Sequence, residues 1–202
     1  ILGDRAKKKW RNSADRFLEC DEVEKIKERE GYEGLFRLIE QTPVIYLKAF
    51  GPICEVTAES YSFVKPSKNI EEKGAYLFRE LTGQCVGVHV RRTDHTEAIA
   101  NSPLVLFAER MKKELETAAD TSFFVATDDK EVRRELKELL PDAKLIFPQS
   151  DVIDRDSKEG IEEAFIEMLA LSKCRKILGS YNSTFSLLPS YIGNIPLETV
   201  HK

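Results

Sequence analysis

Three short segments of the sequence gather arginines, carboxylates and hydroxyls, the side chains that proteins use to bind phosphate and sugar groups. In the first segment, the apolar run 85–90 leads directly into Arg91 and Arg92. A diphosphate lying between two such guanidinium groups would accept bidentate hydrogen bonds, each contributing about 1.5–3 kcal/mol. The alternative is an internal lattice of ion pairs, in which both arginines pair with Asp94 or Asp128.

The second segment places Asp128 and Asp129 directly after another apolar run, 122–126. Asp128 could cap the helix that follows, with Glu131 completing a capping box. Capping accounts for one aspartate and leaves the other without a role. Both carboxylates are therefore also candidates to accept hydrogen bonds from sugar hydroxyls or a base edge, or to orient the arginines.

The third segment is rich in hydroxyl side chains and includes Ser180 and Ser183, between the apolar run 176–178 and a helical stretch. The free backbone N–H groups and the dipole at a helix N-terminus both favour an anion, so a phosphate group suits this junction. The alternative is that Ser183 serves only as the N-cap of the helix.

The elements that must position these segments alternate regularly from residue 69 onward. Short apolar strands alternate with amphipathic helices, which is typical of βαβ units and of a parallel sheet covered on both faces. We expect strands over 85–90, 122–126, 143–147, 176–179 and 197–200, and helices over 70–81, 103–118, 130–140, 158–172 and 184–192. Ligands bind beyond the carboxyl ends of such strands, so the three segments would share one rim. We interpret residues 67–202 as one doubly wound, Rossmann-like α/β domain.

Residues 1–66 have a different composition and predict no complete domain. Between Asp15 and Glu40 the chain is dense in Lys, Glu and Arg, and its apolar residues, Phe17 and Leu18 among them, have loosely helical spacing. One short strand is expected over 44–48. We interpret this part as a partial, mainly helical N-terminal segment.

Composition excludes several classes of protein. The 202 residues carry a net charge of −4, which implies no general attraction to nucleic acid or acidic membranes. No apolar run approaches the ~20 residues that span a bilayer. The four cysteines form no CxxC pair, which argues against a zinc ribbon or a disulfide scaffold and favours a reducing, cytoplasmic location. Neither GxGxxG nor GxxxxGK[ST] occurs, which disfavours dinucleotide oxidoreductases and P-loop NTPases.

With these motifs in order, the sequence resembles the GDP-fucose-dependent fucosyltransferases, and in particular the α1,6-fucosyltransferase and nodulation fucosyltransferase branch. The resemblance is carried by the string His89-Val90-Arg91-Arg92-Thr93-Asp94, by Ala126-Thr127-Asp128-Asp129, and by Ser180-x-x-Ser183-x-Phe185-Ser186. It implies that residues 67–202 form the donor-binding half of a GT-B fold, and that residues 1–66 supply part of the acceptor-side half.

The resemblance also implies roles for individual residues. Arg91 and Arg92 would grip the diphosphate of GDP-fucose and neutralise the leaving phosphate, and Asp94 would hold the arginine pair. Glu97 would deprotonate the acceptor hydroxyl. Further residues expected at the donor are His89, Asp128, Asp129, Glu167, Ser180 and Ser183, where Glu167 stands in place of the family's usual aspartate. Enzymes of this family invert the anomeric centre without a metal ion, so we expect no cofactor and no metal. The expected partners are a GDP-sugar and a saccharide acceptor.

The sequence is also compatible with two other functions. The chain could be a non-catalytic module that binds a nucleotide sugar or a glycan, or a transferase that uses another nucleotide sugar. Comparison of GDP with UDP binding, and an assay of donor turnover, would separate these possibilities.

Overall fold

The computed structural model describes residues 12–49, 51–81, 83–150, 154 and 156–202. The chain divides into two compact units, one ending at Val56 and the other running from Thr57 to Lys202. The division comes earlier than the change in composition near residue 66. The reason is that the 3₁₀ turn η1 (Ala58–Tyr61) belongs to the C-terminal unit, where the ring of Tyr61 stacks on that of Tyr191 at 5.8 Å.

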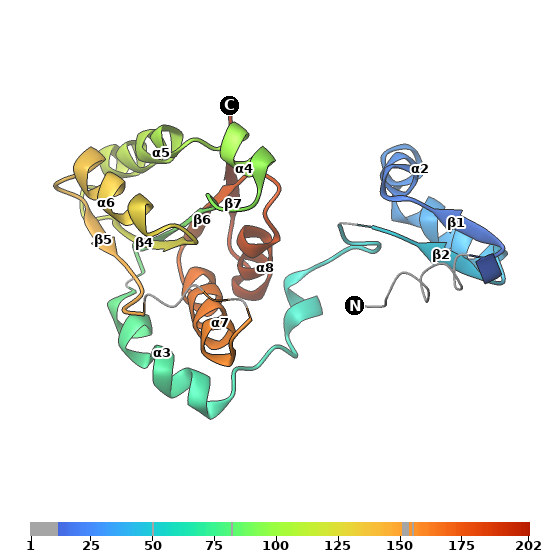
Figure 1. Cartoon of the computed structure of the whole chain (residues 1–202), viewed down its shortest axis with the longest axis horizontal. Coiled ribbons are helices and arrows are strands. Elements are labelled where there is room, and N and C mark those ends of the chain that lie inside the picture. Colours follow the sequence, from blue (N-terminus) through green and yellow to red (C-terminus); the bar gives the residue numbers. More distant parts are fainter. Residues whose placement is uncertain (1–11, 50, 82, 151–153, 155) are drawn as a thin grey trace. The chain divides into compact units, whose positions relative to one another are not determined.

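The C-terminal unit is built around a five-stranded sheet with the order β5-β4-β3-β6-β7, in which every neighbouring pair is parallel (Figure 1). The strands are β3 (Val86–Val90), β4 (Ser122–Thr127), β5 (Lys144–Ile146), β6 (Lys176–Ser180) and β7 (Leu197–Val200). The helices are α3 (Lys68–Glu80), α4 (Thr96–Asn101), α5 (Leu104–Thr117), α6 (Lys130–Leu139), α7 (Lys158–Ser172) and α8 (Thr184–Gly193). The expected α/β class and its strands and helices are confirmed, and α4 is an additional helix that the sequence pattern did not predict.

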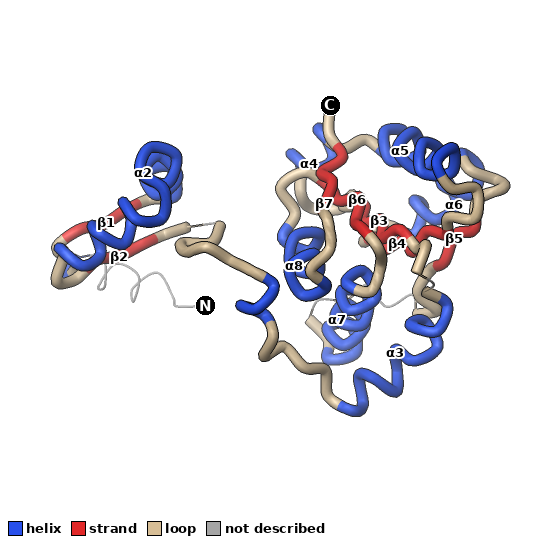
Figure 2. The backbone as a smooth tube through the Cα atoms, turned by 180° about the vertical axis from the view of Figure 1, so that it is seen from behind, coloured by secondary structure: helices blue, strands red, loops and turns tan. Residues whose placement is uncertain are grey.

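Helices cover both faces of this sheet, as Figure 2 shows. Helices α5 and α6 pack on one face, against strand residues such as Val88 and Val125. Helices α3 and α7 pack on the other face, against Phe124 and Ala126. Because successive side chains of a strand point to opposite faces, a strand covered on both sides buries all of its side chains. This explains why all of β3 and β4 is buried.

The N-terminal unit, described by itself, contains β1 (Arg16–Leu18), α2 (Cys20–Gln41) and β2 (Ile45–Leu47), with the two strands parallel. The strand expected over 44–48 is confirmed as β2. The helical interpretation of Phe17 and Leu18 is wrong, because Phe17 pairs with Tyr46 of β2 and their rings stack at 4.9 Å. Pairing with a distant strand here overrides the local helical spacing.

Candidate functional site

The turn that follows β3 is fixed to the neighbouring strand by Ser180, the last residue of β6. Its hydroxyl accepts a hydrogen bond from the backbone N–H of Arg91 at 2.9 Å and donates one to the carbonyl of His89 at 3.0 Å. Ser180 is buried. The sequence predicted that Ser180 would lie at the donor. In the structure its hydroxyl bonds to two backbone groups and sets the path of the turn that carries Arg91 and Arg92, the arginine turn.

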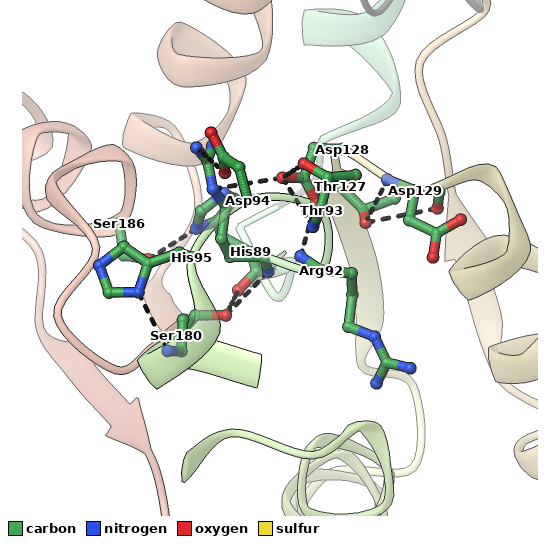
Figure 3. A network of polar contacts seen from close by, with 12 residues as sticks. His89, Arg92, Thr93, Asp94, His95, Thr127, Asp128, Asp129, Ser180 and Ser186 are labelled. Carbon is green, nitrogen blue, oxygen red and sulfur yellow. Dashed lines mark hydrogen bonds and ion pairs between the residues drawn. The ribbon is translucent and has the colours of Figure 1, made fainter. Parts of the chain in front are cut away.

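Asp128 holds the same turn from the other side, because it follows β4, the opposite neighbour of β3. Its carboxylate accepts hydrogen bonds at 2.7 Å from the backbone N–H of Arg92 and from the hydroxyl of Thr93, as drawn in Figure 3. It also pairs with the Nε of Arg91 at 3.2 Å, and Asp94 pairs with the Nη2 of Arg91 at 2.5 Å. The internal ion-pair lattice is therefore present for Arg91.

Arg92 is different from its neighbour. Its side chain leads away from the Asp128 cluster in Figure 3, and within the described part of the chain no hydrogen bond or ion pair reaches its guanidinium group. The two adjacent arginines thus have different roles. The charge of Arg91 is neutralised by two carboxylates, and the guanidinium N–H donors of Arg92 are available for an anion.

The capping role falls on Asp129, and the prediction that Asp128 caps the next helix is wrong. Asp129 is the N-cap of α6, and its side chain accepts a hydrogen bond from the backbone N–H of Glu131 at 3.0 Å. Asp128 cannot serve here because its two oxygens are committed to the turn after β3. Of the open alternatives for this pair, one aspartate orients the arginine turn and the other caps the helix.

His89 lies buried in the last part of β3, with 3% of its surface exposed. Its Nδ1 is 2.7 Å from the hydroxyl oxygen of Ser186, and its ring lies 4.8 Å from that of Phe185. Burial lowers the pKa of His89 to about 4; nearby Asp128 opposes this fall and Arg91 adds to it. The imidazole is therefore neutral near pH 7. It borders the site as an uncharged polar group and supplies no positive charge.

These residues border a cavity of about 260 Å³ at the carboxyl end of the sheet. Its lining comes from β3, β4, α7, α8 and the loops beside them: His89, Arg91, Thr127, Asp128, Asp154, Gly160, Ile161, Ala164, Glu167 and Phe185. The carboxyl of Glu167 has no hydrogen-bond partner among the described residues, and burial raises its pKa to about 7, with Arg133 opposing and Glu163 reinforcing the rise. A carboxyl left unpaired in a partly apolar cavity is typical of a binding site.

Four of the predicted site residues therefore line one cavity: His89, Arg91, Asp128 and Glu167. Asp94 pairs with Arg91, and Arg92 follows Arg91 in the chain, but neither is part of the described cavity lining. Ser183 is the N-cap of α8, and no side-chain capping hydrogen bond occupies its hydroxyl. Glu97 lies exposed on α4 and is not part of the cavity lining.

The sequence pattern missed the contribution of the first turns of α7. Ile161 and Ala164 are apolar residues of the amphipathic helix expected over 158–172, whose apolar face predicts contact with the sheet, yet both line the cavity. Ile161 is 56% exposed, which is unusual for a core position. The available signal was the glycine at 160: a Cβ there would lie 1.7 Å from the carbonyl oxygen of Asp154, so only glycine permits this close approach beside the cavity.

Two further properties bear on the class of site. The described residues contain no group of three or more His, Cys, Asp or Glu side chains arranged to hold a metal ion. Across the same residues, no helix has the length and apolar character needed to cross a membrane.

Comparison with known proteins gives a likeness of fold without a close relative in sequence. No protein-family model and no curated protein matches the sequence. Among solved structures, POFUT1 in complex with GDP matches with a TM-score of 0.54 and 15% identity, over 81% of this chain and 59% of that one. The NodZ α-1,6-fucosyltransferase co-crystallized with GDP matches with a TM-score of 0.52 and 21% identity, over 84% of this chain and 58% of that one. NodZ from Bradyrhizobium gives a TM-score of 0.51 and 22% identity over the same shares.

The chain thus spans less than two thirds of the length of the structures it matches. The resemblance inferred from the motifs is confirmed at the level of fold: the chain has the architecture of one half of the GT-B-like fold of these fucosyltransferases.

Proposed function

We propose that this chain is the donor-binding half of an inverting fucosyltransferase, and that its cavity receives GDP-fucose. One observation carries the proposal: the arginine turn after β3 and the unpaired carboxyl of Glu167 meet at a single cavity at the carboxyl end of a parallel sheet. Ligands of such sheets bind at this end. The fold is shared with proteins whose structures were determined with GDP and with GDP-fucose, which supports the choice of ligand.

The diphosphate would lie against the arginine turn. Arg91 is held in place by Asp128 and Asp94, so its position is fixed before the ligand arrives. Arg92 supplies a forked set of donors without an internal partner among the described residues. The positive charge of Arg92 would stabilise the negative charge that develops on the leaving phosphate as the bond from C1 to oxygen breaks. Ser183, at the N-terminus of α8, would add a hydroxyl donor.

The nucleoside would be recognised by Glu167, a role that the sequence pattern offered to Asp128 or Asp129. Those two carboxylates are occupied by the arginine turn and by the cap of α6, whereas Glu167 lines the cavity and its carboxyl has no hydrogen-bond partner among the described residues. Guanine presents neighbouring N–H donors on one edge, and a carboxylate can accept two hydrogen bonds from them. Ile161 and Phe185 would supply apolar contact to the base.

Glu97 remains the proposed base for the transfer. It would accept the proton of the acceptor hydroxyl while that oxygen attacks C1 of fucose and GDP departs, which inverts the anomeric centre. Its exposure on α4 leaves room for an acceptor. No metal ion is required by this scheme, because the arginines carry the positive charge.

A thermal-shift titration with GDP tests the proposal directly. We expect GDP, with or without EDTA, to raise the melting temperature of the wild-type chain more than UDP does, and Arg92→Ala to abolish the shift. Arg134→Ala is the matched control, since that arginine is 60% exposed and its ion-pair partners within the described part of the chain are Glu131 and Glu138 of its own helix. A melting curve that does not respond to millimolar GDP would contradict the proposal.

One observation favours a second function, a non-catalytic module that binds a nucleotide sugar. The proposed base is not among the residues that line the cavity. Release of GDP from GDP-fucose separates the two functions: tight binding of GDP without any turnover supports the module, and turnover that Glu97→Gln reduces supports the transferase. A transferase for another nucleotide sugar would bind UDP as tightly as GDP.

A further inference from the structure

Ser102 is a fully buried residue at the junction of α4 and α5, and its hydroxyl joins two distant segments. The hydroxyl donates a hydrogen bond to the carbonyl of Val200 at 2.5 Å and accepts one from the backbone N–H of Tyr181 at 2.8 Å. The backbone N–H of Ser102 bonds to the carbonyl of Ala98 at 2.8 Å and so ends α4. One side chain therefore connects α4 to the chain leaving β6 and to the end of β7.

The partners of Ser102 belong to the rim of the candidate site. Val200 pairs with Ser180 across β6 and β7, and Tyr181 follows Ser180 directly. Ser180 in turn holds the backbone N–H of Arg91. A continuous set of hydrogen-bonded segments thus runs from the arginine turn through the end of β6 to Ser102.

Helix α4 depends on such contacts because it has only six residues. A helix this short is not stable by itself in water. A second contact supports it, since the backbone N–H of Lys202 donates to the carbonyl of Asn101 at 3.0 Å. Figures 1 and 2 both show α4 beside the C-terminal end of the chain and β7. The end of the sheet, through Ser102 and Asn101, therefore determines where α4 lies.

We propose that Ser102 is a positioning residue for the transfer reaction, holding α4 so that Glu97 stands in a fixed place relative to the arginine turn. This rests on the proposed function, in which Glu97 is the base. Among the described residues, the hydrogen bonds of the Ser102 hydroxyl reach Val200 and Tyr181, which are not part of the cavity lining, so its role would be exerted through α4. Loss of its hydroxyl leaves the Tyr181 N–H and the Val200 carbonyl without that partner in a buried region, which frees the end of α4 to shift.

The first experiment measures α4 itself. In Ser102→Ala, the backbone amides of Ile99 and Ser102, which are bonded within α4, are expected to exchange with solvent at least tenfold faster than in the wild type. Ser190→Ala is the matched control: Ser190 is also buried, and its hydroxyl bonds to the carbonyl of Leu187 within its own helix, α8, with no other partner among the described residues. Equal α4 exchange in the two variants would overturn the proposal.

The second experiment asks whether Ser102 acts through Glu97. Hydrolysis of GDP-fucose, with water as the acceptor, is measured for Ser102→Ala, Glu97→Gln and the double variant. We expect Ser102→Ala to lower kcat at least tenfold while KM for GDP-fucose changes less than threefold, and to have no further effect once Glu97 is replaced. Losses that multiply in the double variant would show a merely structural role and overturn the proposal.

These experiments distinguish failure of the proposed transferase function from failure of the proposed role of Ser102. A wild-type chain without turnover overturns the proposed transferase and this role of Ser102 with it, whereas turnover that Ser102→Ala leaves intact overturns the role of Ser102 alone. Should Ser102→Ala fail to fold, Ser102→Cys replaces it in the same comparison of single and double variants, because a thiol occupies similar space and is a much weaker hydrogen-bond donor.

Discussion

Asp128 bonds to the backbone N–H of Arg92 at 2.7 Å while the Arg92 side chain points away from it (Figure 3). The carboxylate therefore fixes the place from which this arginine extends without neutralising its charge. Its own counter-ion is Arg91, at 3.2 Å. The consequence is a turn in which one arginine stabilises the protein and its neighbour is available to a ligand.

The two arginines are expected to differ in their effect on stability. Arg92→Ala should change the free energy of unfolding by no more than about 0.5 kcal/mol, because its guanidinium has no partner among the described residues. Arg91→Ala should lower the free energy of unfolding by about 1–3 kcal/mol, since it removes the guanidinium group that pairs with both Asp128 and Asp94. Urea unfolding of both variants without ligand measures the difference. Equal losses would show that Arg92 is paired within the fold.

The two adjacent aspartates should also separate under the same substitution. Asp128→Asn replaces an acceptor-only carboxylate with a group that must turn an N–H₂ toward another donor, so we expect a loss of about 1–3 kcal/mol in unfolding free energy. We also expect at least tenfold weaker GDP binding. Asp129→Asn is the matched control and should stay within about 0.5 kcal/mol, because asparagine caps a helix as well as aspartate does. Urea unfolding measures the change in unfolding free energy, and calorimetric titration with GDP measures the change in affinity.

Glu167 should make the stability of the fold depend on pH. Its pKa is raised from 4.5 to about 7, so between these values the folded chain retains a proton that the unfolded chain has released. Stability contributed by the neutral form is present below pH 4.5 and is lost as pH rises toward 7. Glu167→Gln should therefore gain about 1–3 kcal/mol relative to the wild type between pH 5 and pH 8.

The same carboxyl should couple GDP binding to proton release. If guanine is held by the ionised form, binding at pH 7 releases about half a proton per chain. Calorimetry in buffers with different ionisation enthalpies measures this number, and Glu167→Gln, which has no proton to release there, is the control. Binding that releases the same number of protons in both proteins would remove Glu167 from the nucleoside site.

Gly179 should be irreplaceable because α8 packs directly on its backbone. A Cβ at this position would lie 2.5 Å from the Cβ of Ser186 and 2.8 Å from the Cδ1 of Leu197. Gly179→Ala should cost about 1–3 kcal/mol in stability and disturb the bond between Ser186 and His89. Gly83→Ala should be nearly neutral in the same thermal unfolding measurement, because among the described residues no atom beyond its chain neighbours lies within 4 Å of the added carbon.

The sequence by itself determined the sheet and its helices. Runs such as 85–90 and 122–126 are largely apolar, and the helices between them have one apolar face, so local periodicity is sufficient to predict a parallel sheet covered on both sides. The order of the motifs also predicted that the arginine turn and the aspartate pair meet at one rim, because the carboxyl ends of parallel strands lie at the same edge.

Only the tertiary structure decided what each polar side chain does at that rim. Asp128 and Asp129 are adjacent and chemically identical, and their roles differ because β4 lies beside β3 and turns one carboxylate toward the arginine turn. His89 and Ser186 are 97 residues apart, so no local pattern links them. The local spacing around Phe17 predicts a helix, but pairing with β2 places this residue in a strand. A sequence pattern records which face of an element is apolar, whereas the direction and partner of a polar group depend on contacts between segments distant in the chain.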